Sequence, residues 1–378
     1  MVEFFDPNAT GTGDGSSSAN ACTNIDEAVA AVDFGGYIFV PDMDYTFSGS
    51  NIQITKPVKI QALNPGKAIW RTLSTNRTFT IYPTGYQFGI NVSSVTDSDT
   101  ISGPSVNSYT KNIDGYYTGS SFSTSSAVTG NEVYNIVNHT FDGTNHTFTL
   151  DRPISGTLSG SITFYEEIFS NEDSAIRDMV LVDFNTISSA NGNGVGFQIY
   201  SKNNTTAAST ACGSMIFERN SILQTYNINA DNKTGFFIRN DVHTVVPVRY
   251  KVQNNTFSLK NYPGSGGNRV YPHNLGSGAH LSINDAEKRF CSNNSYYFYS
   301  NVDSNPDYGT GFNQGSNSIW VIESEYGYTS SSHNGDTLSE GNYAYGVNNA
   351  NLSMNPFVNA IDGDFRLRPN SPLIGKGQ

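Results

Sequence analysis

Tyr, Arg and His side chains come together when three similar segments of the chain are aligned, and these residue types can supply an acid, a base and a cation. The segments resemble strands that begin with Gly, at residues 196–200, 235–239 and 278–282. Their alignment places Tyr200 beside Arg239 and puts His280 in the neighbouring row. Cleaving a uronic-acid chain by β-elimination needs a cation that neutralises the carboxylate, a base and an acid. We therefore predict these three residues as a candidate catalytic group; a sugar-binding surface and ordinary solvated residues remain the alternatives.

Four further residues are candidates for binding a substrate. Lys202 and Asp241 fall in the row that follows Tyr200 and Arg239 in the same alignment. The aromatic run at 296–299 must send alternate rings outward if it is a strand, which selects Tyr297 and Tyr299 for contact with sugar rings. The competing interpretation is an aromatic ladder inside an elongated core.

Asp183 and Glu218 form an alternative acid pair. They occupy equivalent positions in two copies of a repeat, and adjacent strands lie about 4.8 Å apart. Glycoside hydrolysis uses two carboxyl groups roughly 5 to 9 Å apart, so such a pair is one way to cut a polysaccharide. The next copies carry Gln253 and Ser292, and a pair of solvated surface residues is the structural alternative.

Other functional classes lack their signatures. The sequence has no phosphate-binding loop, no nucleophile elbow and no His/Cys metal spacing, so we predict no metal site and no cofactor. Calcium is the one ion whose ligand types, Asp, Asn and backbone oxygens, are abundant. A net charge of −12 without a basic stripe argues against nucleic acid. No apolar run predicts membrane insertion, and the first ten residues do not read as a secretory signal.

A repeat organises the second half of the chain. The unit is apolar-x-x-Asn-Ser/Thr-apolar, and its Asn residues are Asn185, Asn220, Asn255 and Asn294. Each copy supplies short strands and no helix, which favours a parallel β-helix over helical repeats. We expect the four Asn side chains to stack at one turn as a structural ladder.

Four regions follow from this pattern. Residues 1–83 contain a short helical pattern over 24–32 and the first strands, and form an N-terminal cap with the first coils. Residues 84–168 are rich in Ser and Thr and lack the repeat, which predicts a small inserted antiparallel β-domain. Residues 169–350 carry the main coils, and residues 351–378 close the fold. The predicted class is all-β.

Both ends of the chain carry a specific resemblance. The tail Asn355-Pro-Phe-Val-Asn-Ala-Ile-Asp-Gly-Asp-Phe-Arg-Leu-Arg-Pro and the opening Asp6-Pro-Asn-Ala-Thr-Gly-Thr-Gly-Asp-Gly resemble right-handed parallel β-helix proteins of the pectate-lyase-like superfamily. That group includes family 6 polysaccharide lyases and phage tailspikes. The Lys, Arg and acidic calcium cluster of the family 6 lyases has no aligned counterpart in this sequence.

The resemblance implies a function on surface polysaccharides. We expect a phage virion tailspike or tail-fibre-like protein that binds host surface polysaccharide, with degradation of that polysaccharide as an open alternative. It also implies a homotrimer in contact with other virion tail proteins. The alternative is a secreted, extracellular polysaccharide lyase of the alginate or uronan type, or a glycoside hydrolase.

Overall fold

The computed structural model describes most of the chain as short strands. The described residues are 2–47, 52–72, 76–77, 79–81, 87–107, 110–124, 132–167, 172–183, 185–186, 194–201, 214–224, 235–242, 249–262, 270–274, 289–300, 318–324, 343–345, 351–360 and 364–375. Within these ranges one α-helix, α1 (Ile25–Ala31), accompanies the strands. The predicted all-β class is confirmed.

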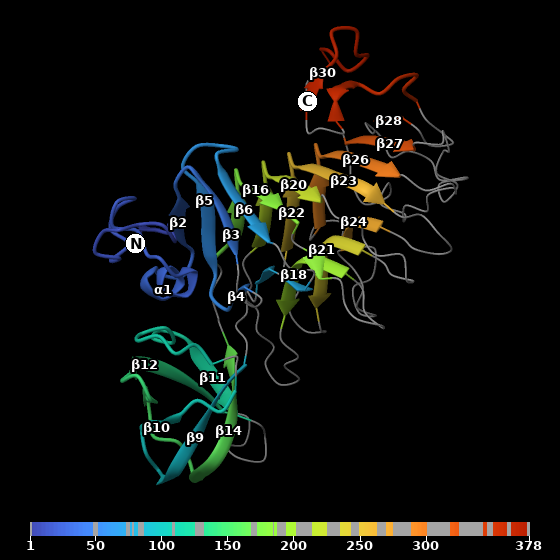
Figure 1. The fold of residues 1–378 in the computed structure, drawn as a ribbon. Helices are drawn as coiled ribbons and strands as arrows, with labels where there is room; N and C mark the ends of the chain where they lie inside the picture. The colour runs from blue at the N-terminus through green and yellow to red at the C-terminus, as the bar shows by residue number, and fades with distance from the viewer. Residues whose placement is uncertain are drawn as a thin grey trace.

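Three parallel sheets form the larger part of the molecule, which we call the stack (Figure 1). The first sheet contains β1 (Val2–Phe4), β2 (Gly36–Val40), β5 (Val58–Ala62), β15 (Ser174–Arg177), β19 (Ser214–Glu218), β22 (Arg249–Gln253) and β25 (Arg289–Ser292). The second contains β3 (Met43–Phe47), β6 (Ala68–Thr72), β16 (Val180–Val182), β20 (Ser221–Gln224), β23 (Thr256–Tyr262), β26 (Ser295–Ser300), β27 (Ile319–Ser324) and β28 (Tyr343–Tyr345). The third contains β4 (Ile52–Ile54), β8 (Phe79–Ile81), β18 (Gly194–Ser201), β21 (Gly235–Val242) and β24 (Val270–Asn274).

From β2 to β26 the strands of these sheets follow one another in the order first, second and third, so one passage through the three sheets makes a coil. Each strand pairs in parallel with its counterpart in the next coil, as β19 does with β22 and β20 with β23. The inward positions therefore align: Ile60, Ile176, Phe217 and Val252 follow one another in the first sheet, and all are buried. A continuous apolar core along the stack results, to which each coil adds the same few side chains.

A ladder of asparagines lies at the turn between the first and second sheets. Asn220 donates its backbone N–H to Oδ1 of Asn255 (3.0 Å), and Asn255 donates in the same way to Asn294 (3.0 Å). The residue before each ladder position is left-handed, with a φ of 55° to 57° at Arg219, Asn254 and Asn293. The ladder predicted for Asn220, Asn255 and Asn294 is confirmed.

Asn185 was wrongly assigned to this ladder. It lies in the two-residue strand β17 (Asn185–Thr186), which pairs antiparallel with β7 (Asn76–Arg77). The ladder position in that coil belongs to Met179, whose backbone N–H donates to Oδ1 of Asn220 (3.1 Å). The sequence pattern around Asn185 matches the repeat, but the turn that aligns with Asn220 comes six residues earlier in the chain.

Six antiparallel strands form a separate sheet after β8. They are β9 (Gln87–Thr96), β10 (Thr100–Pro104), β11 (Ser121–Thr124), β12 (Val133–Phe141), β13 (Asn145–Leu150) and β14 (Thr157–Glu167). A bridge between Ile90 and Ser105 joins the two edges, so the sheet closes into a barrel. Gly103 permits this closure, because a Cβ there would lie 1.9 Å from the carbonyl oxygen of Asn91. The boundaries predicted at 84 and 168 lie outside the described residues.

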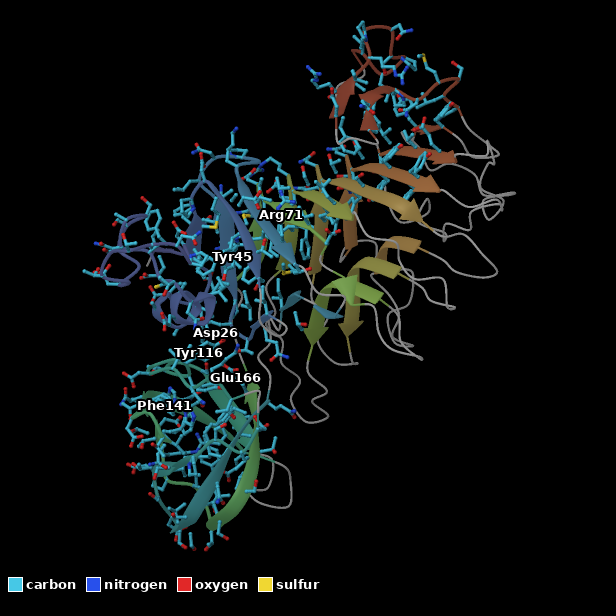
Figure 2. The ribbon with its side chains drawn as sticks, viewed as in Figure 1. Asp26, Tyr45, Arg71, Tyr116, Phe141 and Glu166 are labelled. Carbon is cyan, nitrogen blue, oxygen red and sulfur yellow. The ribbon has the colours of Figure 1, made fainter. Side chains whose placement is uncertain are left out.

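The barrel contacts the stack near α1 (Figure 2). Lys111 of the barrel lies 2.7 Å and 2.9 Å from the two carboxylate oxygens of Asp26. The hydroxyl groups of Tyr116 and Thr55 are 2.8 Å apart and buried. Lys56, next to Thr55 in the stack, donates to the carbonyl of Ala30 in α1 (3.2 Å), so this hydrogen bond lies within the stack, and burial lowers the pKa of its ammonium to about 8. Polar contacts therefore hold the barrel against the stack.

The last strands, β29 (Phe357–Asn359) and β30 (Asp364–Leu367), pair antiparallel beyond the end of the coils. With neighbouring residues they form a second apolar cluster against the outer side of the second sheet. Its fully described members are Tyr297, Ile319, Val321, Leu352, Phe357, Ala360 and Leu373.

Candidate functional site

The third sheet carries Tyr200 and Arg239, two of the three residues predicted to be catalytic, in a register that differs from the predicted one. Tyr200 lies opposite Asp241, and Arg239 lies between Gln198 and Asn274. The shift relative to the prediction is two residues, so Tyr200 and Arg239 are diagonal neighbours in the observed pairing of the two strands.

The strand that follows β21 in this sheet is β24 at 270–274, whereas the sequence predicted 278–282. Asn274, rather than a residue of the predicted segment, therefore completes the row of Arg239. His280 and Lys202 lie outside the described residues.

Tyr297 does not offer a surface to a ligand. Its ring is fully buried, and its hydroxyl donates to Oε2 of Glu323 (2.9 Å). The ring packs edge-on against Phe365 of the closing segment, with ring centroids 6.2 Å apart. Tyr299 is partly buried against the same cluster. The alternation predicted for this strand places Tyr297 outward, but the closing segment covers it, so its assignment as a substrate-binding residue was wrong.

Asp183 and Glu218 do not form an acid pair. Asp183 follows β16 in the second sheet, whereas Glu218 ends β19 in the first sheet. The residue that aligns with Glu218 in the preceding coil is Arg177. The prediction was wrong because it used the same displaced copy of the repeat that placed Asn185 in the ladder.

A row of polar and aromatic residues on the outer side of the first sheet was not predicted. We call it the first-sheet row. Its members are partly exposed, pair from strand to strand, and alternate with the buried residues of the core; they are Phe4, Phe39, Gln61, Arg177, Glu218 and Gln253. Five strand spacings separate its ends, about 24 Å, which is the length of several sugar units.

Ion pairs and amide hydrogen bonds fix the polar side chains of this row. Arg177 lies 3.1 Å from Oε2 of Glu218, and Gln253 donates to the other oxygen of Glu218 (3.0 Å). Arg219 binds Asp178 through Nε (2.7 Å) and Nη2 (3.0 Å), and Nη1 lies 2.9 Å from Glu218. Gln61 donates to Asp178 as well (3.2 Å). Donors and acceptors thus stand at fixed positions across four coils.

A sequence signal for this row exists. Arg177, Glu218 and Gln253 each stand two residues before the ladder position of their coil, and a left-handed residue separates the two. Once the coils are aligned on the ladder, these positions point away from the core because strand side chains alternate.

The guanidinium of Arg219, which binds both Asp178 and Glu218, gives a testable effect on stability. Arg219→Lys should lower the free energy of unfolding by about 1–2 kcal/mol, because an ammonium cannot bind the almost buried Asp178 with two parallel bonds. The control is Arg366→Lys, which changes an equally bidentate pair with Asp364 in which the guanidinium is exposed, and should leave stability unchanged. Urea denaturation measures the free energy of unfolding of both variants. Equal losses of stability would show that the network does not depend on the two parallel bonds from the Arg219 guanidinium to Asp178.

The described residues hold no group of three or more His, Cys, Asp or Glu side chains arranged to bind a metal ion. None of the helices among the described residues is long and apolar enough to cross a membrane.

Comparisons with known proteins give distant structural neighbours. No family model and no curated protein matches the chain. A glycoside hydrolase structure aligns with a TM-score of 0.28 and 9% identity, over 85% of this chain and 75% of that one. The Gp54 tailspike of Acinetobacter baumannii bacteriophage AP22, in complex with A. baumannii capsular saccharide, aligns with a TM-score of 0.17 and 11% identity, over 82% of this chain and 63% of the tailspike. At these TM-scores neither neighbour assigns a function to this chain.

Proposed function

We propose that this chain is a phage virion tailspike or tail-fibre-like protein that binds host surface polysaccharide along its stack. In this proposal the stack is a right-handed parallel β-helix, the region 84–168 is an inserted domain, and three copies assemble in parallel next to other tail proteins. The observation that carries the proposal is the first-sheet row, because its partly exposed aromatic, amide and charged side chains repeat at the strand spacing. A polymer lying along the stack meets one such side chain per coil.

A second candidate is a polysaccharide lyase or glycoside hydrolase, secreted or part of a virion. The third sheet favours it, since Tyr200, Asp241 and Arg239 are neighbours in the observed register. Tyr and Asp supply an acid and a base, and Arg pairs with a sugar carboxylate.

One experiment tests both candidates. The protein is applied to an array of purified bacterial capsular and O-antigen polysaccharides, and each bound polymer is then incubated with it and sized by gel filtration. Binding without loss of polymer length is expected for a binding protein, whereas shortened chains indicate the enzyme. Arg239→Ala should weaken binding of an acidic polymer by about 1.5–3 kcal/mol, the usual contribution of a hydrogen bond to a charged group. Absence of binding to every polymer, or a monomer in sedimentation velocity, would contradict the tailspike proposal.

A further inference from the structure

Three aromatic rings lie together on the outer side of the first sheet at its N-terminal end. We call Phe4, Tyr37 and Phe39 the aromatic platform. The centroids of Tyr37 and Phe39 are 5.7 Å apart with planes 20° from parallel, and those of Phe4 and Phe39 are 5.9 Å apart. All three rings are partly exposed, whereas Ile38 between them is fully buried. Strand alternation thus separates the platform from the core.

The platform is not explained by packing. None of its rings belongs to the apolar clusters found among the described residues. Val2, which pairs with Tyr37 across the strands, is 47% exposed and extends the apolar surface. A contiguous apolar patch facing water costs free energy that a ligand recovers by covering it.

The charges around the platform indicate the chemistry of that ligand. Lys59 lies 5.3 Å from the centroid of the Tyr37 ring, but its ammonium donates to the carbonyl of Gly35 (2.8 Å) and is 3.8 Å from Glu172. Its charge is therefore largely balanced. The chain carries a net charge of −12, which disfavours the densely charged phosphates of a nucleic acid.

The platform is continuous with the first-sheet row. Phe4 and Phe39 are its first two members, and Phe39 pairs directly with Gln61, whose amide belongs to the polar network. A ligand that covers the rings is thus placed to continue along the row. A pyranose unit meets these conditions, because one face of its ring presents C–H groups while its edge carries hydroxyls.

We propose that the aromatic platform is a stacking subsite for an uncharged pyranose unit of the bound polysaccharide. This proposal rests on the proposed polysaccharide binding and adds where the chain of sugars begins and what kind of unit it places there.

The test replaces rings by branched apolar side chains of similar hydrophobicity. In the double variant Tyr37→Leu with Phe39→Leu, affinity for the polymer that the array identifies should fall at least tenfold. The matched control is Tyr37→Phe, which keeps the ring and removes the hydroxyl, and it should bind within about twofold of wild type. Near-UV circular dichroism checks that both variants fold as wild type does.

Saturation-transfer NMR on the wild-type protein gives a second measurement that needs no variant. With an oligosaccharide of the bound polymer, saturation is expected on the ring C–H protons of an uncharged unit.

The outcomes separate this subsite from the proposed function. If wild type binds a polymer and the double Leu variant binds it equally, the subsite is wrong while polysaccharide binding stands. If Tyr37→Phe loses as much affinity as the double Leu variant, the polymer contacts the Tyr37 hydroxyl and does not stack on the ring, and the proposal is overturned. NMR saturation confined to uronate units would overturn it as well. If wild type binds no polymer on the array, the proposed function fails and the subsite fails with it.

Discussion

Asn255→Ala should lower the free energy of unfolding by about 3–5 kcal/mol, one of the two largest effects that we expect in this protein. Asn255 is buried in the middle of the ladder. Its Oδ1 accepts from the backbone N–H (3.0 Å) and the Nδ2 (3.1 Å) of Asn220, and its Nδ2 donates to Phe217 O (2.9 Å) and Asn294 Oδ1 (3.1 Å). Alanine leaves these buried partners unpaired, and each unsatisfied buried group costs about 1–3 kcal/mol.

The matched control lies one residue earlier. Asn254 is exposed and left-handed, with a φ of 57°, so Asn254→Gly removes a side chain without forcing a new backbone conformation. Its effect should stay within about 0.5 kcal/mol. Urea denaturation followed by far-UV circular dichroism measures both variants. A loss below about 1 kcal/mol for Asn255→Ala would mean that water replaces the amide, and the ladder would then not stabilise the stack in the way its geometry indicates.

The ladder shows which parts of this fold the sequence predicts. A buried amide needs partners on both sides, so an Asn that recurs in similar surroundings marks a position that stacks on itself. This reasoning located Asn220, Asn255 and Asn294. The reasoning failed at Asn185 because a short pattern of common residues also occurs there by chance. The position of a residue within its coil is set by strand pairing, and β15, the strand before Met179, is the one that pairs with β5 and β19.

The candidate site depended on features that a local pattern does not contain. The observed register pairs Gly194 of β18 with Gly235 of β21, so an alignment of Gly196 with Gly235 was two residues off for Tyr200 and Arg239. Tyr297 was correctly placed on the outer side of its strand, yet a segment more than 50 residues later covers it. Such long-range packing is not visible in a strand's own alternation.

The interior of the barrel predicts a pH dependence. His139 and His146 are both buried and form a chain of hydrogen bonds: the backbone N–H of Tyr117 donates to His139 Nδ1 (3.5 Å), His139 Nε2 lies 3.0 Å from His146 Nδ1, and His146 Nε2 lies 3.0 Å from Asn112 Oδ1. The direction set by the Tyr117 amide assigns both imidazoles as neutral, each with its proton on Nε2. A proton added to Nδ1 of His139 would point at the N–H of Tyr117, and a proton added to Nδ1 of His146 would point at the Nε2–H of His139.

Burial lowers the pKa of both imidazoles to about 4, although Asp114 near His139 and Asp142 near His146 act in the opposite direction. In the unfolded chain the pKa returns to about 6.5. The unfolded state therefore binds protons first, so the stability of the barrel is full above about pH 6.5 and falls as the pH decreases toward about 4. Since one pKa unit corresponds to about 1.4 kcal/mol, the two rings together remove several kcal/mol over this window.

The measurement is the free energy of unfolding by urea between pH 8 and pH 4, followed by near-UV circular dichroism, which reports the packed rings around Phe148. The control replaces both imidazoles by Phe, which keeps the stacking on Phe148 and should flatten the slope between pH 6.5 and 4 even if overall stability changes. Carboxylates such as Asp44, whose pKa is lowered by its hydrogen bonds to Arg71, reduce stability only below about 4, outside this window. A slope that persists in the double Phe variant, or imidazole NMR signals that titrate near pH 6.5 in the folded protein, would exclude the histidine pair as the origin of the acid sensitivity.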